Sequence, residues 1–248
     1  MRIHHLLLIS CLLIFISCER KSGRQNTGKK QEQTTKVRRA DNSSTSINTT
    51  TEVSSKRNKR VLTGPEIFDK YNSAVFMVYT SDGISGFQGS GFFVSENGVA
   101  VSNYHVFKGT TKGFETIKLT DGRTLKVEEV LDYSESLDYI VFKVDIGNKR
   151  VTFIPVSDGK TRVGDKAYAI GSPRGLENTF SSGEISQIRS DNVLQISVPI
   201  DHGSSGGALL NHYGEVIGIT TAGLDESGAN LNFAMSINVV IKNIQKYH

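Results

Sequence analysis

The chain has 248 residues and a formal net charge of +4 at pH 7. That basicity belongs to one segment, because residues 19–60 carry 12 Lys/Arg against 4 Asp/Glu, whereas residues 61–248 carry 16 against 21. The larger part is mildly acidic, which argues against nucleic acid as its main partner. The 2 cysteines, Cys11 and Cys18, both precede residue 61, which excludes a disulfide or a cysteine metal site from residues 61–248.

Residues 1–17 are predicted to be an export signal. Arg2 precedes an apolar run of 12 residues, 6–17, which is too short for a membrane-spanning helix. At its end, Phe15-Ile16-Ser17-Cys18 resembles the lipobox of bacterial lipoproteins. The resemblance implies that Cys18 is acylated and that an exported protein is anchored to a membrane of the cell envelope, facing the periplasm or the exterior. The alternative is an ordinary signal peptide that contains a cysteine.

Residues 18–60 are predicted to be a disordered basic linker. Between residues 42 and 55, Ile47 and Val53 are the only large aliphatic residues. Such a segment buries too little apolar surface to offset its chain entropy. We expect a solvated tether, with contact between its basic clusters and anionic surfaces as the alternative.

The folded domain is predicted to span residues 61–248. Thr63 and Glu66, three positions apart with Pro65 between them, predict a capped helix that ends near Tyr71. Short runs of period-two alternation follow, separated by turn pairs such as Asp82-Gly83. These runs are 74–80, 89–94, 99–102, 114–119, 124–131, 139–144, 166–170, 179–188, 193–198, 208–210, 216–221 and 232–236.

The regular spacing of these runs predicts an all-β fold rather than alternating βα units. We expect two six-stranded antiparallel β-barrels, one over about 72–150 and one over about 160–236. A helix over 237–247 is expected to follow them.

A serine lies between glycines in the second half of the domain, at Gly203-Ser204-Ser205-Gly206-Gly207. Glycines permit unusual backbone angles, and they allow the amides of Gly203 and Ser205 to face one point, where they would bind an oxyanion. The same letters fit the Gly-x-Ser-x-Gly elbow of α/β-hydrolases, but that fold needs its acid and histidine after the serine. Only 43 residues follow Ser205, and alternating helices are lacking before it, so we reject that fold.

Two candidate partners for Ser205 lie in the first half. His105 follows an apolar strand, and Asp138 opens another. A buried aspartate needs hydrogen-bond donors, and one that accepts from a histidine N–H holds the ring in the tautomer that takes a proton from serine. Weaker alternatives in turn-like contexts are Asp132, Asp145 and His202.

Together these segments resemble the HtrA/DegP branch of trypsin-like serine proteases over about residues 62–244. They occur in the family's order and are Gly89-Ser90-Gly91-Phe92, Ser102-Asn103-Tyr104-His105-Val106, Asp138-Tyr139-Ile140-Val141, residues 169–176, residues 203–209 and Asn232-Phe233-Ala234-Met235. The resemblance implies a site between two barrels, with His105 as general base, Asp138 as its orienting residue and Ser205 as nucleophile. It further implies that the amides of Gly203, Ser204 and Ser205, with the loop at Gly175-Leu176, form the oxyanion hole. No metal or cofactor is expected.

Four positions depart from the family's usual residues. Ser204 replaces Asn and Ala208 replaces Pro, while Tyr104 and Tyr139 stand where small or aliphatic residues are more common. None of these changes removes a reacting group. The family often carries a PDZ domain after the protease, and none is expected in this chain.

Pro199 lies six residues before Ser205, where relatives specific for basic side chains carry an acid. With Asn232, Phe233 and Ala234 as the opposite wall of the pocket, we expect a preference for small or medium aliphatic side chains. The resemblance implies polypeptide substrates, including unfolded envelope proteins, and a homotrimer. The alternatives are a processing protease with one partner and a non-catalytic, chaperone-like binding barrel.

Overall fold

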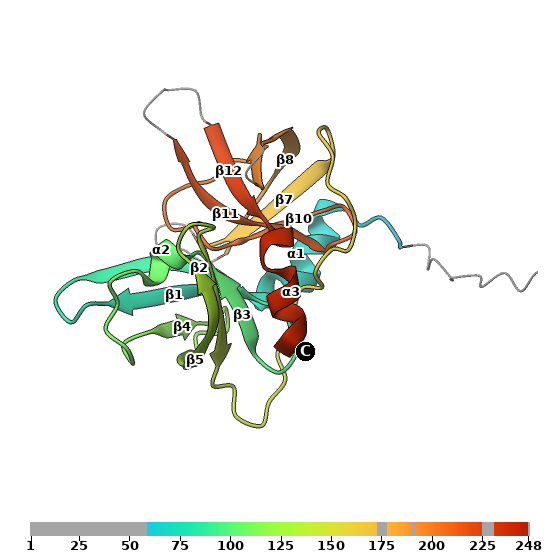
Figure 1. Ribbon diagram of the computed structural model, residues 1–248. Helices are drawn as coiled ribbons and strands as arrows, with labels where there is room; N and C mark the ends of the chain where they lie inside the picture. The colour runs from blue at the N-terminus through green and yellow to red at the C-terminus, as the bar shows by residue number, and fades with distance from the viewer. Residues whose placement is uncertain (1–58, 173–177, 190–191, 225–230, 248) are drawn as a thin grey trace, which may run out of the picture. The chain divides into compact units, whose positions relative to one another are not determined.

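The computed structural model describes residues 59–172, 178–189, 192–224 and 231–247 (Figure 1). The predicted signal, Cys18, almost all of the predicted linker and the loop at Gly175-Leu176 lie outside the described residues. Among the described residues, no helix has the length and apolarity needed to cross a membrane.

A capped helix, α1 (Gly64–Tyr71), opens the domain. The Glu66 carboxylate accepts hydrogen bonds from the N–H and the hydroxyl of Thr63, each at 2.8 Å. These bonds, led by the one from the Thr63 N–H, lower the pKa of Glu66 to about 2. Ile67 and Tyr71, one turn apart, are buried and fix the face that α1 presents to the core.

Barrel 1 is formed by the first six strands. They are β1 (Val75–Ser81), β2 (Gly86–Phe93), β3 (Val99–Ser102), β4 (Thr116–Lys118), β5 (Thr124–Ser134) and β6 (Tyr139–Val144). The strands are antiparallel and close in the order β1-β2-β3-β6-β5-β4. Phe76, Phe93 and Phe142 are fully buried and pack together inside it.

Barrel 2 repeats this order with the second six strands. They are β7 (Lys166–Gly171), β8 (Thr179–Ile188), β9 (Val193–Ile196), β10 (Ala208–Leu210), β11 (Val216–Leu224) and β12 (Leu231–Ser236). The barrel closes as β10-β11-β12-β9-β8-β7, again antiparallel. The predicted all-β fold of two six-stranded barrels is confirmed.

The helix predicted over 237–247 is divided in the structure. The segment forms three short helical turns: η4 (Ile237–Val239), α3 (Ile241–Ile244) and η5 (Gln245–Tyr247). Four of the first five residues are β-branched, which lowers helix propensity. Val240, between the first two turns, has φ −119° and ψ −9°, away from regular helical values.

The two barrels share one core. An apolar cluster takes Val101 from barrel 1, Ile170 from barrel 2, Ile67 from α1 and Ile244 from α3. In agreement, α1 and α3 lie beside each other along the barrels in Figure 1. The barrels are thus packed against each other as parts of one domain.

The C-terminal turns also make polar contacts with barrel 1. The Asn243 side chain donates to the Asp132 carboxylate and to the Tyr139 hydroxyl, which itself donates to Asp132 at 3.1 Å. The Tyr247 hydroxyl donates to the Leu131 carbonyl at 3.1 Å. Burial is the main cause that raises the pKa of Tyr139. A segment that follows barrel 2 in sequence therefore braces β5 and β6.

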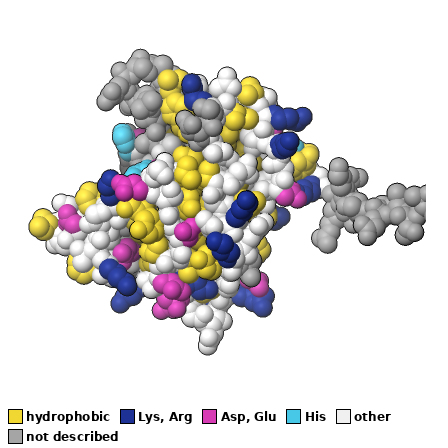
Figure 2. All heavy atoms as spheres, in the orientation of Figure 1, with side chains coloured by type: hydrophobic (Ala, Val, Ile, Leu, Met, Phe, Trp, Pro, Cys, Tyr) yellow, Lys and Arg dark blue, Asp and Glu magenta, His cyan; other side chains and the backbone are white. Residues whose placement is uncertain are grey.

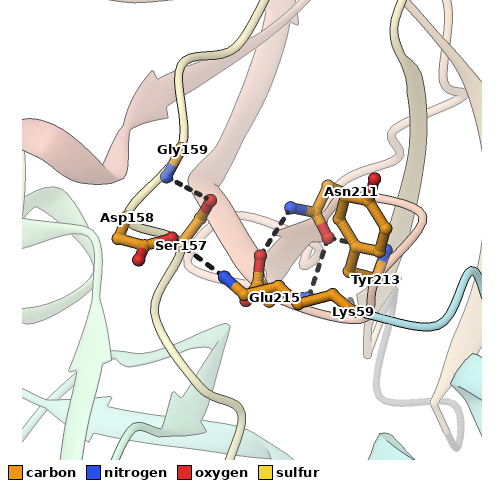
Figure 3. A network of polar contacts seen from close by, with 7 residues as sticks. All are labelled: Lys59, Ser157, Asp158, Gly159, Asn211, Tyr213 and Glu215. Carbon is orange, nitrogen blue, oxygen red and sulfur yellow. Dashed lines mark hydrogen bonds and ion pairs between the residues drawn. The ribbon is translucent and has the colours of Figure 1, made fainter. Parts of the chain in front are cut away.

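Lys59, the first described residue, is anchored on barrel 2 (Figure 3). Its Nζ lies 2.6 Å from a Glu215 carboxylate oxygen and 2.9 Å from Asp158 Oδ1. Asn211 donates to the same Glu215 carboxylate at 3.0 Å. The hydrogen bond to Glu215 is the largest of the contacts that raise the pKa of Lys59. The chain thus enters the domain at barrel 2.

On the face of the domain shown in Figure 2, basic and acidic side chains are interspersed. Apolar side chains lie between them. This mixed surface agrees with the composition of residues 61–248.

Candidate active site

His105 lies on α2 (Tyr104–Phe107), a single helical turn soon after β3. The sequence predicted a histidine at the end of a strand, but not this turn. Val106 and Phe107 are buried in the barrel 1 core, whereas the His105 side chain is 45% exposed. The turn therefore fixes the backbone and leaves the imidazole accessible to a substrate.

Asp138 precedes β6 with a left-handed backbone, φ +47°. Aspartate is one of the few non-glycine residues that tolerate this region. Its Oδ2 lies 2.8 Å and its Oδ1 3.1 Å from His105 Nδ1, and Oδ1 also accepts from the His105 N–H at 2.9 Å. The Asn103 side chain donates to the Asp138 carbonyl at 2.9 Å, a role that its place in the motif did not reveal. The predicted pair of His105 and Asp138 is thus joined directly.

A carboxylate only accepts hydrogen bonds, so Nδ1 of His105 carries the hydrogen in this pair. Nε2 is then the acceptor nitrogen of the neutral ring. The other candidates lie in different contacts: Asp132 accepts from Tyr139 and Asn243, Asp145 accepts from the Gly147 N–H, and the His202 N–H bonds to Asp201.

Two contacts brace the turn that carries His105. The Tyr104 ring stacks on Tyr133 of β5, with centroids 5.4 Å apart and planes at 15°. Lys108 forms an ion pair with Glu135 in the β5–β6 connection. Tyr104, a departure from the family's usual residue, is therefore part of the packing around the histidine.

Ser205 lies on the loop between β9 and β10, and Ser204 and Ser205 are both buried. The loop is tightly closed, because Gly207 N–H donates to the Ser204 carbonyl at 3.0 Å and Gly206 N–H to the Thr220 carbonyl at 2.8 Å. Gly206 has φ +87°, and a Cβ there would lie 2.2 Å from a main-chain oxygen of β2. Only glycine fits this position without a shift of the backbone.

Strand β2 brings the histidine turn and the serine loop together. A Cβ on Gly89 would lie 2.7 Å from Val106, the neighbour of His105, and 3.1 Å from the Ser205 carbonyl. That carbonyl accepts from the Ser90 N–H at 2.8 Å. Among the described residues, no hydrogen bond joins Ser205 Oγ to His105. Such catalytic bonds are often long without substrate and tighten in its complex.

Two of the three amides predicted for the oxyanion hole remain available. The Ser204 N–H donates to the Asp201 carbonyl at 3.0 Å and is thus used inside the turn, which corrects its predicted role. Within the described part of the chain, neither the Gly203 N–H nor the Ser205 N–H donates a hydrogen bond. Gly203 has φ +90°, a conformation that glycine adopts readily.

A pocket of about 330 Å³ lies beside Ser204. It is lined by Pro199, Ile200 and Thr220. Its other lining residues come from β7, from β8 and from the loop before Ser205: Ala169, Ile170, Gly171, Thr179, Ser181 and Asp201.

Pro199, which is predicted to shape the substrate pocket, is among the lining residues of this pocket, whereas Asn232, Phe233 and Ala234 are not. Ala234 is fully buried and packs with the apolar core of barrel 2.

Residues 89–219 match the sequence model of the family described as trypsin-like peptidase domain. The chain is 39% identical over 158 residues to a probable periplasmic serine endoprotease DegP-like from Rhizobium meliloti, covering 60% of this chain and 31% of that protein. It is 34% identical over 163 residues to Protease Do-like 1, chloroplastic, from Arabidopsis thaliana, covering 61% and 36%.

The crystal structure of the serine endoprotease from Yersinia pestis resembles this fold with a TM-score of 0.66 and 29% identity, covering 74% of this chain and 66% of that one. The chain spans about a third of the length of the curated relatives named above. The family match extends from β2 to β11, more than half of the chain, and includes His105, Asp138 and Ser205. The chain therefore belongs to the trypsin-like peptidase family.

Proposed function

We propose that this protein is a serine endopeptidase that cleaves peptide bonds through an acyl-enzyme on Ser205. The contact between His105 and Asp138 carries the proposal. It fixes the hydrogen on Nδ1 and leaves Nε2 as the base, in a ring that remains accessible.

In the first step Ser205 Oγ attacks the carbonyl carbon, and its proton passes to His105 Nε2. The carbonyl oxygen becomes an oxyanion, for which the N–H groups of Gly203 and Ser205 are the donors. The C–N bond then breaks, and the leaving amine takes the proton from His105. Water attacks the acyl-enzyme by the same route and releases the carboxylic acid. Asp138 remains ionised and stabilises the imidazolium formed in each step.

For the substrate, we propose unfolded or damaged polypeptides of the cell envelope, cut after small or medium aliphatic side chains. The pocket beside Ser204 supports this preference, because most of its lining residues are apolar or small. The names of the relatives, periplasmic serine endoproteases among them, support an exported protein. Anchoring through an acylated Cys18 and assembly into a homotrimer are parts of the same proposal that rest on the sequence resemblance.

Turnover of casein by the full chain tests the proposal, together with covalent labelling by a fluorophosphonate. Both activities are expected in the wild type and in Ser95→Ala, which changes a buried serine at the β2–β3 turn. Neither is expected in Ser205→Ala. Labelling that survives in Ser205→Ala would overturn the assigned nucleophile. Labelling of the wild type without casein turnover would favour a processing protease with one partner. A wild type that is neither labelled nor able to cleave casein would favour a non-catalytic binding barrel.

A further inference from the structure

Ser90, in the middle of β2, is fully buried and makes hydrogen bonds beyond its own barrel. Its hydroxyl donates to the Gly203 carbonyl at 2.7 Å and accepts from the Ser172 N–H at 2.9 Å. Its main-chain N–H donates to the Ser205 carbonyl at 2.8 Å. One residue of barrel 1 therefore holds both residues whose N–H groups remain available beside the proposed nucleophile.

The bond to the Gly203 carbonyl immobilises the peptide unit between Gly203 and Ser204. At one end of this unit the carbonyl accepts from Ser90, and at the other end the Ser204 N–H donates to the Asp201 carbonyl at 3.0 Å. Rotation of the unit would break both bonds, and the Ser90 hydroxyl that makes the first of them is fully buried. Breaking a buried hydrogen bond leaves unpaired polar groups, which is costly.

Gly203 needs such a restraint from outside. With φ +90° it lies in a region where glycine has wide freedom, so its own backbone preference does not fix the direction of its N–H. The Ser90 hydroxyl holds the carbonyl group of Gly203 in one direction, and this limits the conformational freedom of Gly203. The neighbouring contact with Ser172 joins β2 to the end of β7, so that the hydroxyl itself has a single orientation.

We propose that Ser90 is a positioning residue that sets the oxyanion hole, an inference that rests on the proposed peptidase function. The hydroxyl does not touch the substrate. It acts through Gly203, and together with its main-chain N–H it couples barrel 1 to the loop of Ser205.

Ser102 supplies a matched control. Its hydroxyl is also fully buried and donates to a carbonyl at 2.7 Å, but the acceptor is the Ser90 carbonyl rather than Gly203. Ser90→Ala and Ser102→Ala thus remove the same group from equally buried sites. A purely structural role predicts similar effects of both changes on thermal stability and on turnover.

The experiment measures kcat, KM, the pH dependence of kcat/KM and inhibition by a peptide aldehyde, all with the full chain. Ser205 adds to the aldehyde across its C=O bond, and the hemiacetal oxygen occupies the oxyanion hole. Removing an oxyanion donor lowers kcat by about 10² to 10³, so misplacing one in Ser90→Ala is expected to lower it about 10-fold or more. The inhibition constant of the aldehyde should rise by the same factor, with KM nearly constant.

The acid limb of the pH profile should not move, because Ser90 does not contact His105 or Asp138. Ser102→Ala is expected to lower kcat by less than about threefold, because its hydroxyl donates to the Ser90 carbonyl and not to Gly203. If Ser90→Ala does not fold, Ser90→Cys fills nearly the same space with a weaker donor and should show the same paired changes to a smaller extent.

Equal kcat in the Ser90 and Ser102 variants, or a change in KM alone, overturns the assignment of Ser90 while the peptidase function stands. A wild type that neither cleaves peptides nor labels at Ser205 overturns the peptidase function and the assignment with it. A loss of kcat without weaker aldehyde binding also contradicts the assignment, because the oxyanion hole would then be intact.

Discussion

Asp138→Asn isolates the electrostatic role of the acid, because asparagine has nearly the same shape and also tolerates a left-handed backbone. The carboxylate has two duties: Oδ1 accepts from the His105 N–H at 2.9 Å, and Oδ2 lies 2.8 Å from Nδ1. If the amide oxygen keeps the first contact, the amide NH₂ faces Nδ1. The imidazole must then accept at Nδ1 and carry its hydrogen on Nε2, which removes the base.

An acid-to-amide change in a serine protease triad lowers kcat by about 10⁴, which corresponds to about 5.4 kcal/mol of transition-state stabilisation. We expect a loss of this size at neutral pH, measured with a fluorogenic peptide and by the rate of fluorophosphonate labelling. Asp145→Asn makes the same chemical change in the connection after β6 and should leave both rates close to wild type. If Asp138→Asn keeps more than about a tenth of kcat, the carboxylate does not select the tautomer.

Three further changes test other parts of the structure. Tyr133→Ala removes the ring that stacks on Tyr104 and should lower kcat/KM about 2- to 10-fold. Tyr133→Phe keeps the ring and should leave kcat/KM unchanged. Equal losses of kcat/KM in both variants would contradict a packing role for this ring. The pKa of Glu66 is lowered to about 2, so its contribution to stability is complete above its unfolded pKa near 4.5 and disappears as the pH falls towards 2. Thermal unfolding of Glu66→Gln should lack this part of the acid dependence, and an unchanged pH profile would refute it. Gly206 and Gly109 both have a left-handed backbone, but an added Cβ would meet another atom only at Gly206, at 2.2 Å. Chemical denaturation should therefore show that Gly206→Ala lowers the free energy of unfolding by about 1 to 3 kcal/mol more than Gly109→Ala does. Equal losses in the two variants would refute this steric explanation.

The positions of the strands, and their grouping into two sets of six, could be predicted from local sequence patterns. Period-two alternation marks which residues face the core, and positive-φ glycines such as Gly83 and Gly98 mark the hairpin turns. For this reason β3, β6, β8 and β10 match the predicted ranges to the residue. The spacing of the strands predicted the all-β fold correctly.

The finer geometry of the site depends on contacts between distant segments, which no local pattern encodes. The α2 turn has four residues and no side-chain cap, and the left-handed backbone of Asp138 is set by contacts with Asn103 and His105. The use of the Ser204 N–H follows from the closure of its loop on Asp201. Whether Ala234 faces a pocket or the core depends on how β12 sits in the closed barrel.

The brace from Asn243 and Tyr247 to barrel 1 has a consequence for synthesis. A ribosome makes β1 to β6 well before residues 237–247, so a nascent barrel 1 lacks the partner that later caps Asp132 and Tyr139. The pair of His105 and Asp138 belongs to barrel 1, whereas Ser205, the proposed nucleophile, lies on a loop of barrel 2. A partly made chain that ends before barrel 2 therefore has the proposed base but no serine for it to activate.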